Sequence, residues 1–371
     1  MTWFPVEPDA VRLLRDGREA FPAMLEAIAK ARSEVLLEMY WVGDDECGRS
    51  FRSALVAAAS RGVTVRVIVD AVGSLSLTPQ FWDALVAAGG EVEVFHPLRR
   101  LMGKLDLARL DRRDHRKLLV VDGELAFCGG INLARHWLAI GDGGEGWRDD
   151  AVAVRGPVAT DVRALFYETW RRVRKRGSRV RHVPRFPKEQ VRAVSVVASG
   201  FRPARTIRRE YLRAFARATS SIDIANSYFV PDAGVRRALF RAVARGVRVR
   251  ILLPGRSDVP LVQRASEAVY EVFMKRGAEL FLFPDTILHS KMAVIDDRVT
   301  IVGSYNFDAR SLRKNLEANV VVRNAAFARH VRLWFEHDLA SANKVELDRW
   351  QTRGLAQRAT ERLAFALRRL W

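Results

Sequence analysis

Two short stretches of the chain, "HRKLLVVDG" at 115–123 and "HSKMAVIDD" at 289–297, each place a histidine and a lysine two positions apart before an apolar run. Side chains at positions i and i+2 of a β-strand lie on the same face, so each histidine should project beside its lysine. An imidazole can attack an electrophile or move a proton, and an ammonium group can hold an anion. The pairs that could do this chemistry are His115 with Lys117 and His289 with Lys291.

The two stretches belong to a longer repeated pattern, HxKxxxxD followed after six residues by G[GS]xN. The first copy continues with Asp122 and Asn132, and the second with Asp296, Ser304 and Asn306. Two copies with identical spacing argue against the alternative that the histidines are ordinary buried residues. The segments "VDGE" and "IDDR" are typical of turns, so we expect both aspartates to hold a turn rather than to react.

A further acidic residue follows each copy, because aligning "DDAVAVRG" with "EANVVVRN" sets Asp149 opposite Glu317. A carboxylate that accepts a proton from one ring nitrogen fixes the tautomer of the imidazole and raises the basicity of the other nitrogen. We expect each half of the chain to supply its own carboxylate, so that Glu317 serves His289. Among the other histidines, only His136, after the first GGxN segment, could border the site.

Two such sets brought together would be suited to chemistry at a phosphodiester. The lysines and asparagines would neutralise and orient the phosphate. One histidine would attack phosphorus while the other, protonated, donated to the leaving oxygen, and the roles would reverse in the second step. The cationic side chains would do the work of a metal ion, so we expect neither a metal nor a cofactor.

The motifs lie within an internal duplication, because the segments that precede them recur in the same order. Valines at alternate positions of 63–69, and the matching run at 247–251, predict buried strands. The Ala/Leu/Arg-rich segments before these runs predict helices that end at a glycine. The sequence therefore predicts an α/β fold with two pseudo-symmetric lobes, each a mainly parallel sheet flanked by helices, and an active site at the lobe interface.

The chain divides into an N-terminal lobe at 1–170, a basic linker at 171–192, a C-terminal lobe at 193–340 and a basic tail at 341–371. A basic insertion precedes the first motif, and four of its residues could attract anionic lipid or substrate: Lys104, Arg109, Arg112 and Arg113. The tail repeats apolar residues at helical spacing, which fits a helix on a membrane or one packed on the protein itself. These residues are Leu363, Leu367, Leu370 and Trp371.

The charge balance narrows the range of partners. The 371 residues include 62 Lys and Arg against 43 Asp and Glu, a formal net charge of +19, which favours nucleic acid or an anionic membrane surface. Two cysteines without a CxxC motif indicate no disulfide framework, as in a reducing compartment. No window approaches the ~20 apolar residues of a spanning helix, and the charged amino-terminal stretch does not read as a secretory signal.

The paired motifs resemble the signature of the phospholipase D superfamily, and the chain resembles bacterial cardiolipin synthases of the B type, which lack transmembrane helices. Stretches that carry the resemblance include "LEMYWV", "HRKLLVVDGELAFCGGINLARH", "WRDDAVAVRGP" and "SLRKNLEANVVV". The resemblance implies transfer of a phosphatidyl group to phosphatidylglycerol through a covalent phosphohistidine, giving cardiolipin. It also implies a peripheral protein on the cytoplasmic side of the cell membrane, with anionic phospholipids rather than nucleic acid as partners.

The resemblance also implies roles for the individual residues. His115 would be the nucleophile and His289 the general acid and base, and Asp122 and Asp296 would complete the catalytic signature. The implied phosphate ligands are Lys117, Lys291, Asn132, Ser304 and Asn306, and the residues that would orient the imidazoles are Asp149 and Glu317.

Two other functions fit parts of the sequence. The same site could hydrolyse phospholipid or nucleic acid with water as the acceptor, since the net charge suits either substrate. A catalytically inactive module could bind a membrane or DNA through its basic surface alone, although the intact His, Lys and Asn of both copies argue against it. The phosphatidyl donor and the number of chains in the assembly stay open at this point.

Overall fold

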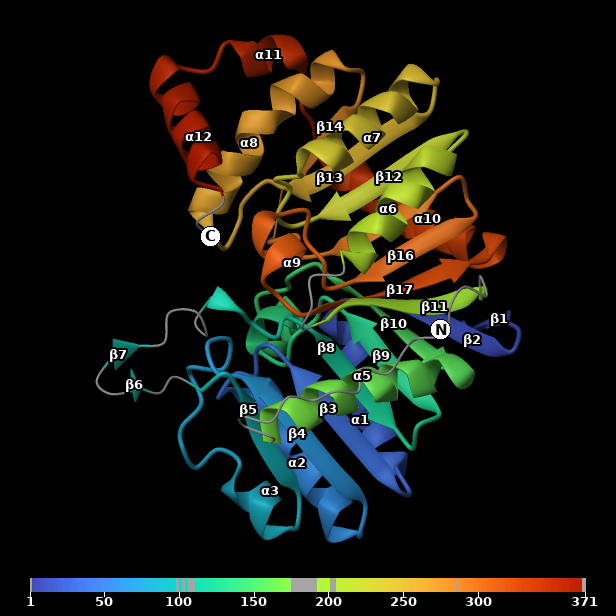
Figure 1. The fold of residues 1–371 in the computed structure, drawn as a ribbon, viewed down its shortest axis with the longest axis vertical. Coiled ribbons are helices and arrows are strands. Elements are labelled where there is room, and N and C mark those ends of the chain that lie inside the picture. The colour runs from blue at the N-terminus through green and yellow to red at the C-terminus, as the bar shows by residue number, and fades with distance from the viewer. Residues whose placement is uncertain are drawn as a thin grey trace.

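The computed structural model describes residues 2–97, 100–101, 104–105, 111–174, 192–200, 205–284 and 286–368. Two lobes, stacked along the long axis of the molecule in Figure 1, each contain one eight-stranded sheet. The α/β architecture with two related lobes is therefore confirmed.

The sheet of the first lobe has the strand order β1-β2-β10-β9-β8-β3-β4-β5. Its strands are β1 (Phe4–Val6), β2 (Asp9–Arg15), β3 (Glu34–Met39), β4 (Thr64–Asp70), β5 (Glu91–Phe95), β8 (Lys117–Val121), β9 (Leu125–Gly129) and β10 (Asp150–Arg155). A separate two-stranded ribbon, β6 (Arg100–Leu101) with β7 (Lys104–Leu105), projects from this lobe (Figure 1).

The sheet of the second lobe has the order β11-β17-β16-β15-β12-β13-β14-β18. Its strands are β11 (Val194–Ser199), β12 (Ser221–Asn226), β13 (Arg248–Pro254), β14 (Glu279–Phe283), β15 (Lys291–Ile295), β16 (Val299–Gly303), β17 (Glu317–Arg323) and β18 (Asn343–Lys344). The run β17-β16-β15-β12-β13-β14 repeats the run β10-β9-β8-β3-β4-β5 of the first lobe, as the duplication predicts.

The expectation of mainly parallel sheets is wrong. Only two of the seven pairings in each sheet are parallel, β3–β4–β5 in the first lobe and β12–β13–β14 in the second. The motif strands β8 and β15 each return through a tight turn into β9 and β16, and such a hairpin must be antiparallel. The helix-connected parallel strands therefore occupy only one side of each sheet, and in the second lobe the short antiparallel β18 lies beyond them.

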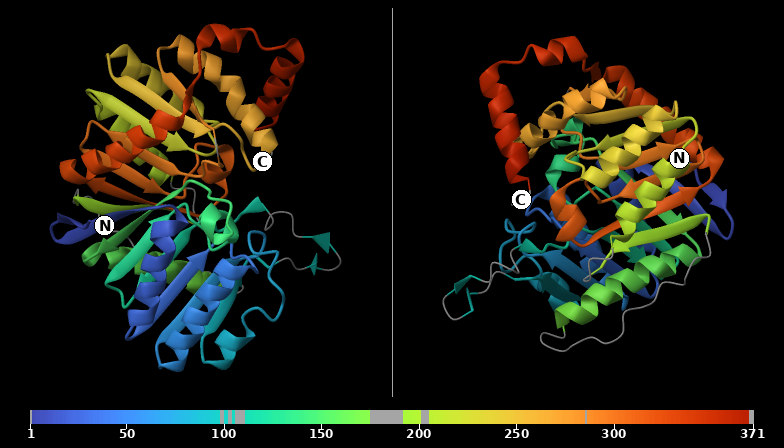
Figure 2. Two further views of the ribbon diagram at one scale, coloured as in Figure 1. Left: turned by 180° about the vertical axis from the view of Figure 1, so that it is seen from behind. Right: turned by 45° about the horizontal axis from the view of Figure 1, so that its top comes forward.

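Helices cover both faces of each sheet (Figures 1 and 2), and the apolar side chains between helices and sheets form three large clusters. In the first lobe, α1 (Asp16–Lys30) and α2 (Glu46–Ser60) cover the outer face. In the second lobe, α6 (Thr206–Arg217), α7 (Ala233–Ala244) and α8 (Pro260–Lys275) do the same. On the other faces, α5 (Pro157–Arg174) packs on the first sheet and α10 (Ala325–Ser341) on the second. Both helices contribute to the largest apolar cluster of the described residues, which the two lobes share. The short helices are α3 (Asp83–Ala87), α9 (Ala309–Arg313) and α11 (Leu347–Gln351).

The tail forms α11 and α12 (Leu355–Leu367), and α12 packs along α8 (Figure 2). Glu361 and Ala364 are buried in this contact, while Leu363 and Leu367 are exposed on the outer side. The tail helix thus packs on the protein and still presents apolar residues to the outside. Leu370 and Trp371 lie outside the described residues, as do 175–191 of the expected linker.

Candidate active site

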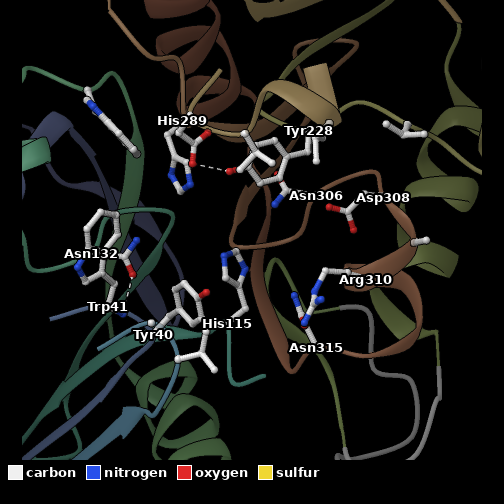
Figure 3. Close-up of a pocket in the computed structure, with 18 of the residues that line it drawn as sticks. Tyr40, Trp41, His115, Asn132, Tyr228, His289, Asn306, Asp308, Arg310 and Asn315 are labelled. Atoms are coloured by element: carbon white, nitrogen blue, oxygen red, sulfur yellow. Dashed lines mark hydrogen bonds between the residues drawn. The ribbon is translucent and has the colours of Figure 1, made fainter. Parts of the chain in front are cut away.

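The two motif histidines approach one another from opposite lobes across a single cavity (Figure 3). Each lies two residues before its strand, His115 before β8 and His289 before β15. The cavity has a volume of about 410 Å³, and both imidazoles and both motif asparagines, Asn132 and Asn306, contribute to its wall. The structure therefore brings the two halves of the repeated motif together, as the sequence predicts.

Each imidazole is paired with the carboxylate of the opposite lobe. His115 Nδ1 lies 3.0 Å and 3.1 Å from the two carboxylate oxygens of Glu317. His289 Nδ1 lies 2.7 Å from Asp149 Oδ2. The expectation that Glu317 serves His289 is therefore wrong, because the histidine–carboxylate pairs cross the interface.

The crossing follows from two short parallel bridges between the lobes. One joins Asp114 to Leu316, with the His115 amide donating to the Leu316 carbonyl at 3.0 Å. The other joins Arg148 to Leu288, with the His289 amide donating to the Arg148 carbonyl at 2.7 Å. Each bridge sets the residue before a histidine beside the residue before a carboxylate of the other lobe. The next residue of one segment is then the histidine, and the next residue of the other segment is its carboxylate partner.

The residues between each histidine and lysine tie the lobes together from the other side of the strand. Arg116 donates to the Ser199 carbonyl of the second lobe at 2.7 Å. Ser290 donates to Asp150 Oδ2 of the first lobe at 2.6 Å. Arg148 also donates to Asp338 Oδ2 of α10 at 2.9 Å. These buried polar contacts fix the two strands relative to each other, which the chemistry of a shared site requires.

The two carboxylates are held by different donors. Glu317 accepts from the hydroxyls of Ser304 and Ser311, the latter at 2.7 Å. Asp149 accepts from the indole nitrogen of Trp137 at 2.9 Å. The Ser304 hydroxyl thus faces Glu317 and not the cavity, which corrects its expected role as a phosphate ligand. The first lobe has glycine at the matching position, Gly130, where an added Cβ would lie 2.2 Å from Asp149 Oδ1.

The lysines lie against the main chain of their own motif. Lys117 Nζ donates to the His115 carbonyl at 2.7 Å, and Lys291 Nζ donates to the His289 carbonyl. Burial lowers the pKa of Lys117 to about 7 and that of Lys291 to about 8. An anion bound beside these two amines would stabilise their charged ammonium forms.

Burial also lowers the pKa of both histidines, and Lys291 lowers that of His289 further. Burial works to raise the pKa of Glu317, but the charges of His115 and Lys117 outweigh it and hold this pKa below its ordinary value. At neutral pH the first pair is thus a neutral imidazole and an ionised carboxylate. Its Nδ1–H donates to Glu317, and the other ring nitrogen, Nε2, keeps its lone pair.

The motif asparagines use their side-chain oxygens within the protein. Asn132 Oδ1 accepts from the Trp41 amide at 3.2 Å, and Asn306 Oδ1 accepts from the Ser227 hydroxyl at 2.8 Å. The engaged oxygens leave the amide NH₂ groups as the donors for a ligand in the cavity.

The motif aspartates lie at the far ends of β8 and β15, away from the histidines. Asp122 accepts from the backbone amides of Arg32, Ser33 and Glu34, and Asp296 accepts from those of Thr219, Ser220 and Ser221. Burial would raise the pKa of Asp296, but these donors hold it at about 2. Both residues fix a turn against the neighbouring strand, so their inclusion among the catalytic groups is corrected.

The cavity wall also contains residues that the sequence reasoning missed. The first lobe supplies an aromatic side, with Trp137 and Trp147 centred 5.3 Å and 5.7 Å from the His289 ring. The second lobe supplies a polar side that includes Tyr228, Asp258, Asp308, Arg310 and Asn315. The repeat offered a signal for one of them, because aligning "EMYWV" with "NSYFV" sets Tyr228 opposite Tyr40, and both tyrosines line the cavity.

Other expected residues lie away from the cavity. His136 packs against Trp41 and Trp147 behind the aromatic side. Arg113, expected to attract an anionic ligand, is buried and paired with Asp70 at 3.3 Å, which corrects that expectation. The side chains of Lys104 and Arg109 lie outside the described residues. No group of three or more His, Cys, Asp or Glu in the described part of the chain has the arrangement of a metal site.

Comparisons with known proteins agree on one family. The family profile described as "Cardiolipin synthase, PLD-like domain" matches residues 24–142 and 211–339. The major cardiolipin synthase ClsA of Bacillus subtilis is 31% identical over 96% of this chain and 74% of its own length. Cardiolipin synthase B of Escherichia coli K12 is 34% identical over 88% of this chain and 79% of its own.

Solved structures with the same fold are more distant in sequence. The phosphatidylserine synthase of Haemophilus influenzae superposes with a TM-score of 0.70 at 14% identity, over 97% of this chain and 93% of its own. The polyphosphate kinase of Porphyromonas gingivalis superposes with a TM-score of 0.61 at 15% identity, over 97% of this chain and 53% of its own. At these identities the similarity concerns the fold alone.

Proposed function

The chain belongs to the cardiolipin synthase family of phospholipase D-like phosphatidyltransferases, and we propose that it transfers a phosphatidyl group to phosphatidylglycerol through a phosphohistidine. One observation carries the proposal: two imidazoles, each oriented by a buried carboxylate, face one cavity from opposite sides. This is the arrangement that a two-step displacement at phosphorus needs.

In the first step, His115 Nε2 attacks the phosphorus of the donor lipid. A bond forms between nitrogen and phosphorus, and the bond from phosphorus to the headgroup oxygen breaks. His289, protonated at Nε2, gives its proton to that oxygen, so the headgroup leaves as a neutral alcohol. The Nδ1–H of His115 stays bonded to Glu317, whose negative charge stabilises the ring as it becomes cationic.

In the second step, a hydroxyl of phosphatidylglycerol attacks the same phosphorus. His289, now neutral, takes the proton of that hydroxyl, and the bond between His115 and phosphorus breaks. The product is cardiolipin, and both histidines return to their starting states.

The phosphate oxygens would be bound by the two lysines and by the NH₂ groups of Asn132 and Asn306. With a pKa of about 7, Lys117 would be drawn into its charged form by the bound anion. An anionic phosphodiester near the His289 ring would likewise favour its protonated form, which the first step requires.

The surroundings of the cavity favour a lipid over a nucleic acid. Five large apolar residues, 38% to 69% exposed, either line the cavity or lie within three residues in the sequence of one that does. They are Leu75, Ile140, Val259, Leu261 and Leu367. Exposed apolar groups on segments that line the cavity suit the interface of a bilayer, and the net charge of +19 suits its anionic headgroups. No helix among the described residues is long and apolar enough to cross a membrane. We therefore propose peripheral binding to the cytoplasmic side of the cell membrane.

The activity is tested with purified protein and phosphatidylglycerol vesicles, with other phospholipids added as candidate donors. Mass spectrometry should detect cardiolipin with the wild type and none with His115→Ala. Phosphatidic acid without cardiolipin would replace the proposal with lipid hydrolysis, and cleavage of DNA that depends on His115 would replace it with a nuclease.

Membrane binding is tested by vesicle flotation. The double variant Leu75→Asp/Leu367→Asp should bind phosphatidylglycerol vesicles at least about tenfold more weakly than the wild type, since each substitution puts a charge into the apolar interface. Leu333→Asp changes a leucine on α10 that is 69% exposed, against 63% for Leu75, and that lies outside the cavity lining, so it serves as the control. Equal binding by all three proteins would contradict the proposed surface.

A further inference from the structure

A carboxylate lines the cavity although the proposed substrates are anions. Asp258 follows β13 and is exposed to the cavity. Its Oδ2 accepts from the Tyr228 hydroxyl at 2.6 Å, and its Oδ1 has a longer contact of 3.4 Å with the Ser257 hydroxyl. A negative charge here would repel a phosphate, so its presence calls for a ligand group that donates a hydrogen bond.

The internal duplication provides a comparison within the same chain. Aligning "RGVTVRVIVDAVGS" with "RGVRVRILLPGRSD" sets Ser74 of the first lobe opposite Asp258. Ser74 is buried, and its hydroxyl serves the local backbone, accepting from the Val42 amide at 3.1 Å and donating to the Tyr40 carbonyl at 3.3 Å. The fold thus needs no carboxylate at this position, and only the second lobe has one.

The other carboxylate of the cavity wall has a structural partner. Asp308 caps α9 by accepting from the Ser311 amide at 2.7 Å, and burial raises its pKa to about 7. Asp258 caps no helix of the described residues, since α8 has Val259 at its N-cap, and its carboxylate contacts the hydroxyls of Tyr228 and Ser257. Its carboxylate is therefore the one in the cavity wall that is available to a ligand.

Asp258 lies on the His289 side of the cavity. Its partner Tyr228 has its ring centred 6.4 Å from that of His289, edge to face (Figure 3). In the proposed mechanism His289 handles the proton of the leaving and incoming alcohols, while His115 occupies the opposite side of phosphorus. Asp258 therefore lies where the incoming alcohol would be.

We propose that Asp258 is a specificity residue that accepts a hydrogen bond from the second hydroxyl of the acceptor's terminal glycerol. The inference rests on the proposed function. Phosphatidylglycerol ends in two neighbouring hydroxyl groups; one attacks phosphorus and loses its proton to His289, and the other donates to Asp258, which undergoes no covalent change. Water and monohydric alcohols lack this second donor, so Asp258 favours a polyol acceptor over them.

The test is a competition between two soluble acceptors. Purified protein is incubated with phosphatidylglycerol vesicles and equal concentrations of deuterated glycerol and 1-propanol. Mass spectrometry then measures deuterated phosphatidylglycerol against phosphatidylpropanol. The wild type should favour glycerol. Asp258→Ser, which introduces the residue of the first lobe, should reduce the product ratio by about tenfold, the usual effect of one lost hydrogen bond to a charged group.

Two further variants sharpen the result. Asp258→Asn keeps an acceptor oxygen without the charge, so its ratio should fall between those of the wild type and Asp258→Ser. Asp83→Asn removes one negative charge from exposed α3 and should keep the wild-type ratio.

Three results would overturn the inference. An unchanged ratio in Asp258→Ser would mean that the carboxylate does not sense the second hydroxyl. An equal loss of both products would mean that Asp258 supports His289 rather than acceptor choice. If the wild type formed neither product, the proposed transfer would fall together with this inference, whereas an unchanged ratio would leave the transfer intact.

Discussion

Replacing Glu317 with glutamine should change the titration of His115 in the other lobe. A carboxylate about 3 Å from an imidazole usually raises the pKa of the ring by one to three units, because it stabilises the charged form. Glu317 opposes the lowering that burial imposes on His115. Its loss should therefore lower the pKa of His115 by a further unit or two, which corresponds to about 1.4 to 2.7 kcal/mol of lost stabilisation of the imidazolium. The rate of phosphatidyl transfer should fall by about ten- to a hundredfold.

The measurement is the titration of the imidazole nitrogens by NMR on protein labelled with 15N-histidine. His115→Gln and His289→Gln assign the two signals. Glu317→Gln should move the His115 signal, Asp149→Asn should move that of His289, and each should leave the other nearly unchanged. Ser304→Ala, which removes a neutral donor to Glu317, is the control and should have a smaller effect. If Glu317→Gln moved the His289 signal and left that of His115 in place, the crossed pairing would be refuted.

Four further predictions concern the motif lysines and Asp296. Sulfate, which does not titrate near neutrality, should bind at least tenfold more weakly at pH 9 than at pH 6.5 by calorimetry, because Lys117 (pKa about 7) and Lys291 (pKa about 8) lose their charge as the pH rises; equal affinity would contradict these pKa values. Lys117→Met should abolish activity yet raise the free energy of unfolding at pH 7 by about 2 kcal/mol in urea, since the unfolded chain binds the lysine proton more readily than the folded one. For the same reason the stability of the wild type should rise with pH between about 7 and 10 more steeply than that of Lys117→Met. Asp296→Ala should lower the free energy of unfolding by about 2 to 3 kcal/mol through the lost turn contacts. Its transfer rate per folded molecule should stay within about twofold, and a loss of activity in fully folded protein would restore a catalytic role.

Local patterns in the sequence predicted the parts of the site that local structure determines. The spacing of His115 and Lys117 indicated one strand, which begins at Lys117, two residues after His115, and the turn chemistry after Val121 correctly indicated a hairpin held by Asp122. Gly62 and Gly246 ended the predicted helices because both adopt positive φ angles, 87° and 85°.

The crossed pairs could not be predicted in this way. They depend on two bridges of one residue pair each, Asp114 with Leu316 and Arg148 with Leu288, between segments about 140 to 200 positions apart. No periodicity within either lobe carries information on that contact. The role of Ser304 was missed for the same reason, since the hydroxyl supports a carboxylate whose histidine comes from the other lobe.

The sheet type was mistaken because alternating helices and strands describe only part of each lobe. β3, β4 and β5 follow the parallel rule, whereas β8, β9 and β10 continue the sheet through antiparallel pairings. The hairpin turn was visible in the sequence, but the sequence did not show that β8 pairs with β3. That pairing joins strands far apart in the chain, so it depends on the tertiary fold.

The most direct test of the central claim is to trap the covalent intermediate. The intermediate is sought in the wild type during turnover, because His289→Ala would lack both the acid for the first step and the base for the second. Rapid quenching after mixing with phosphatidylglycerol, followed by peptide mass spectrometry at neutral to basic pH, should find a phosphatidyl adduct on His115 and none in His115→Ala. An adduct on another residue of the wild type, or cardiolipin formation by His115→Ala, would contradict the account.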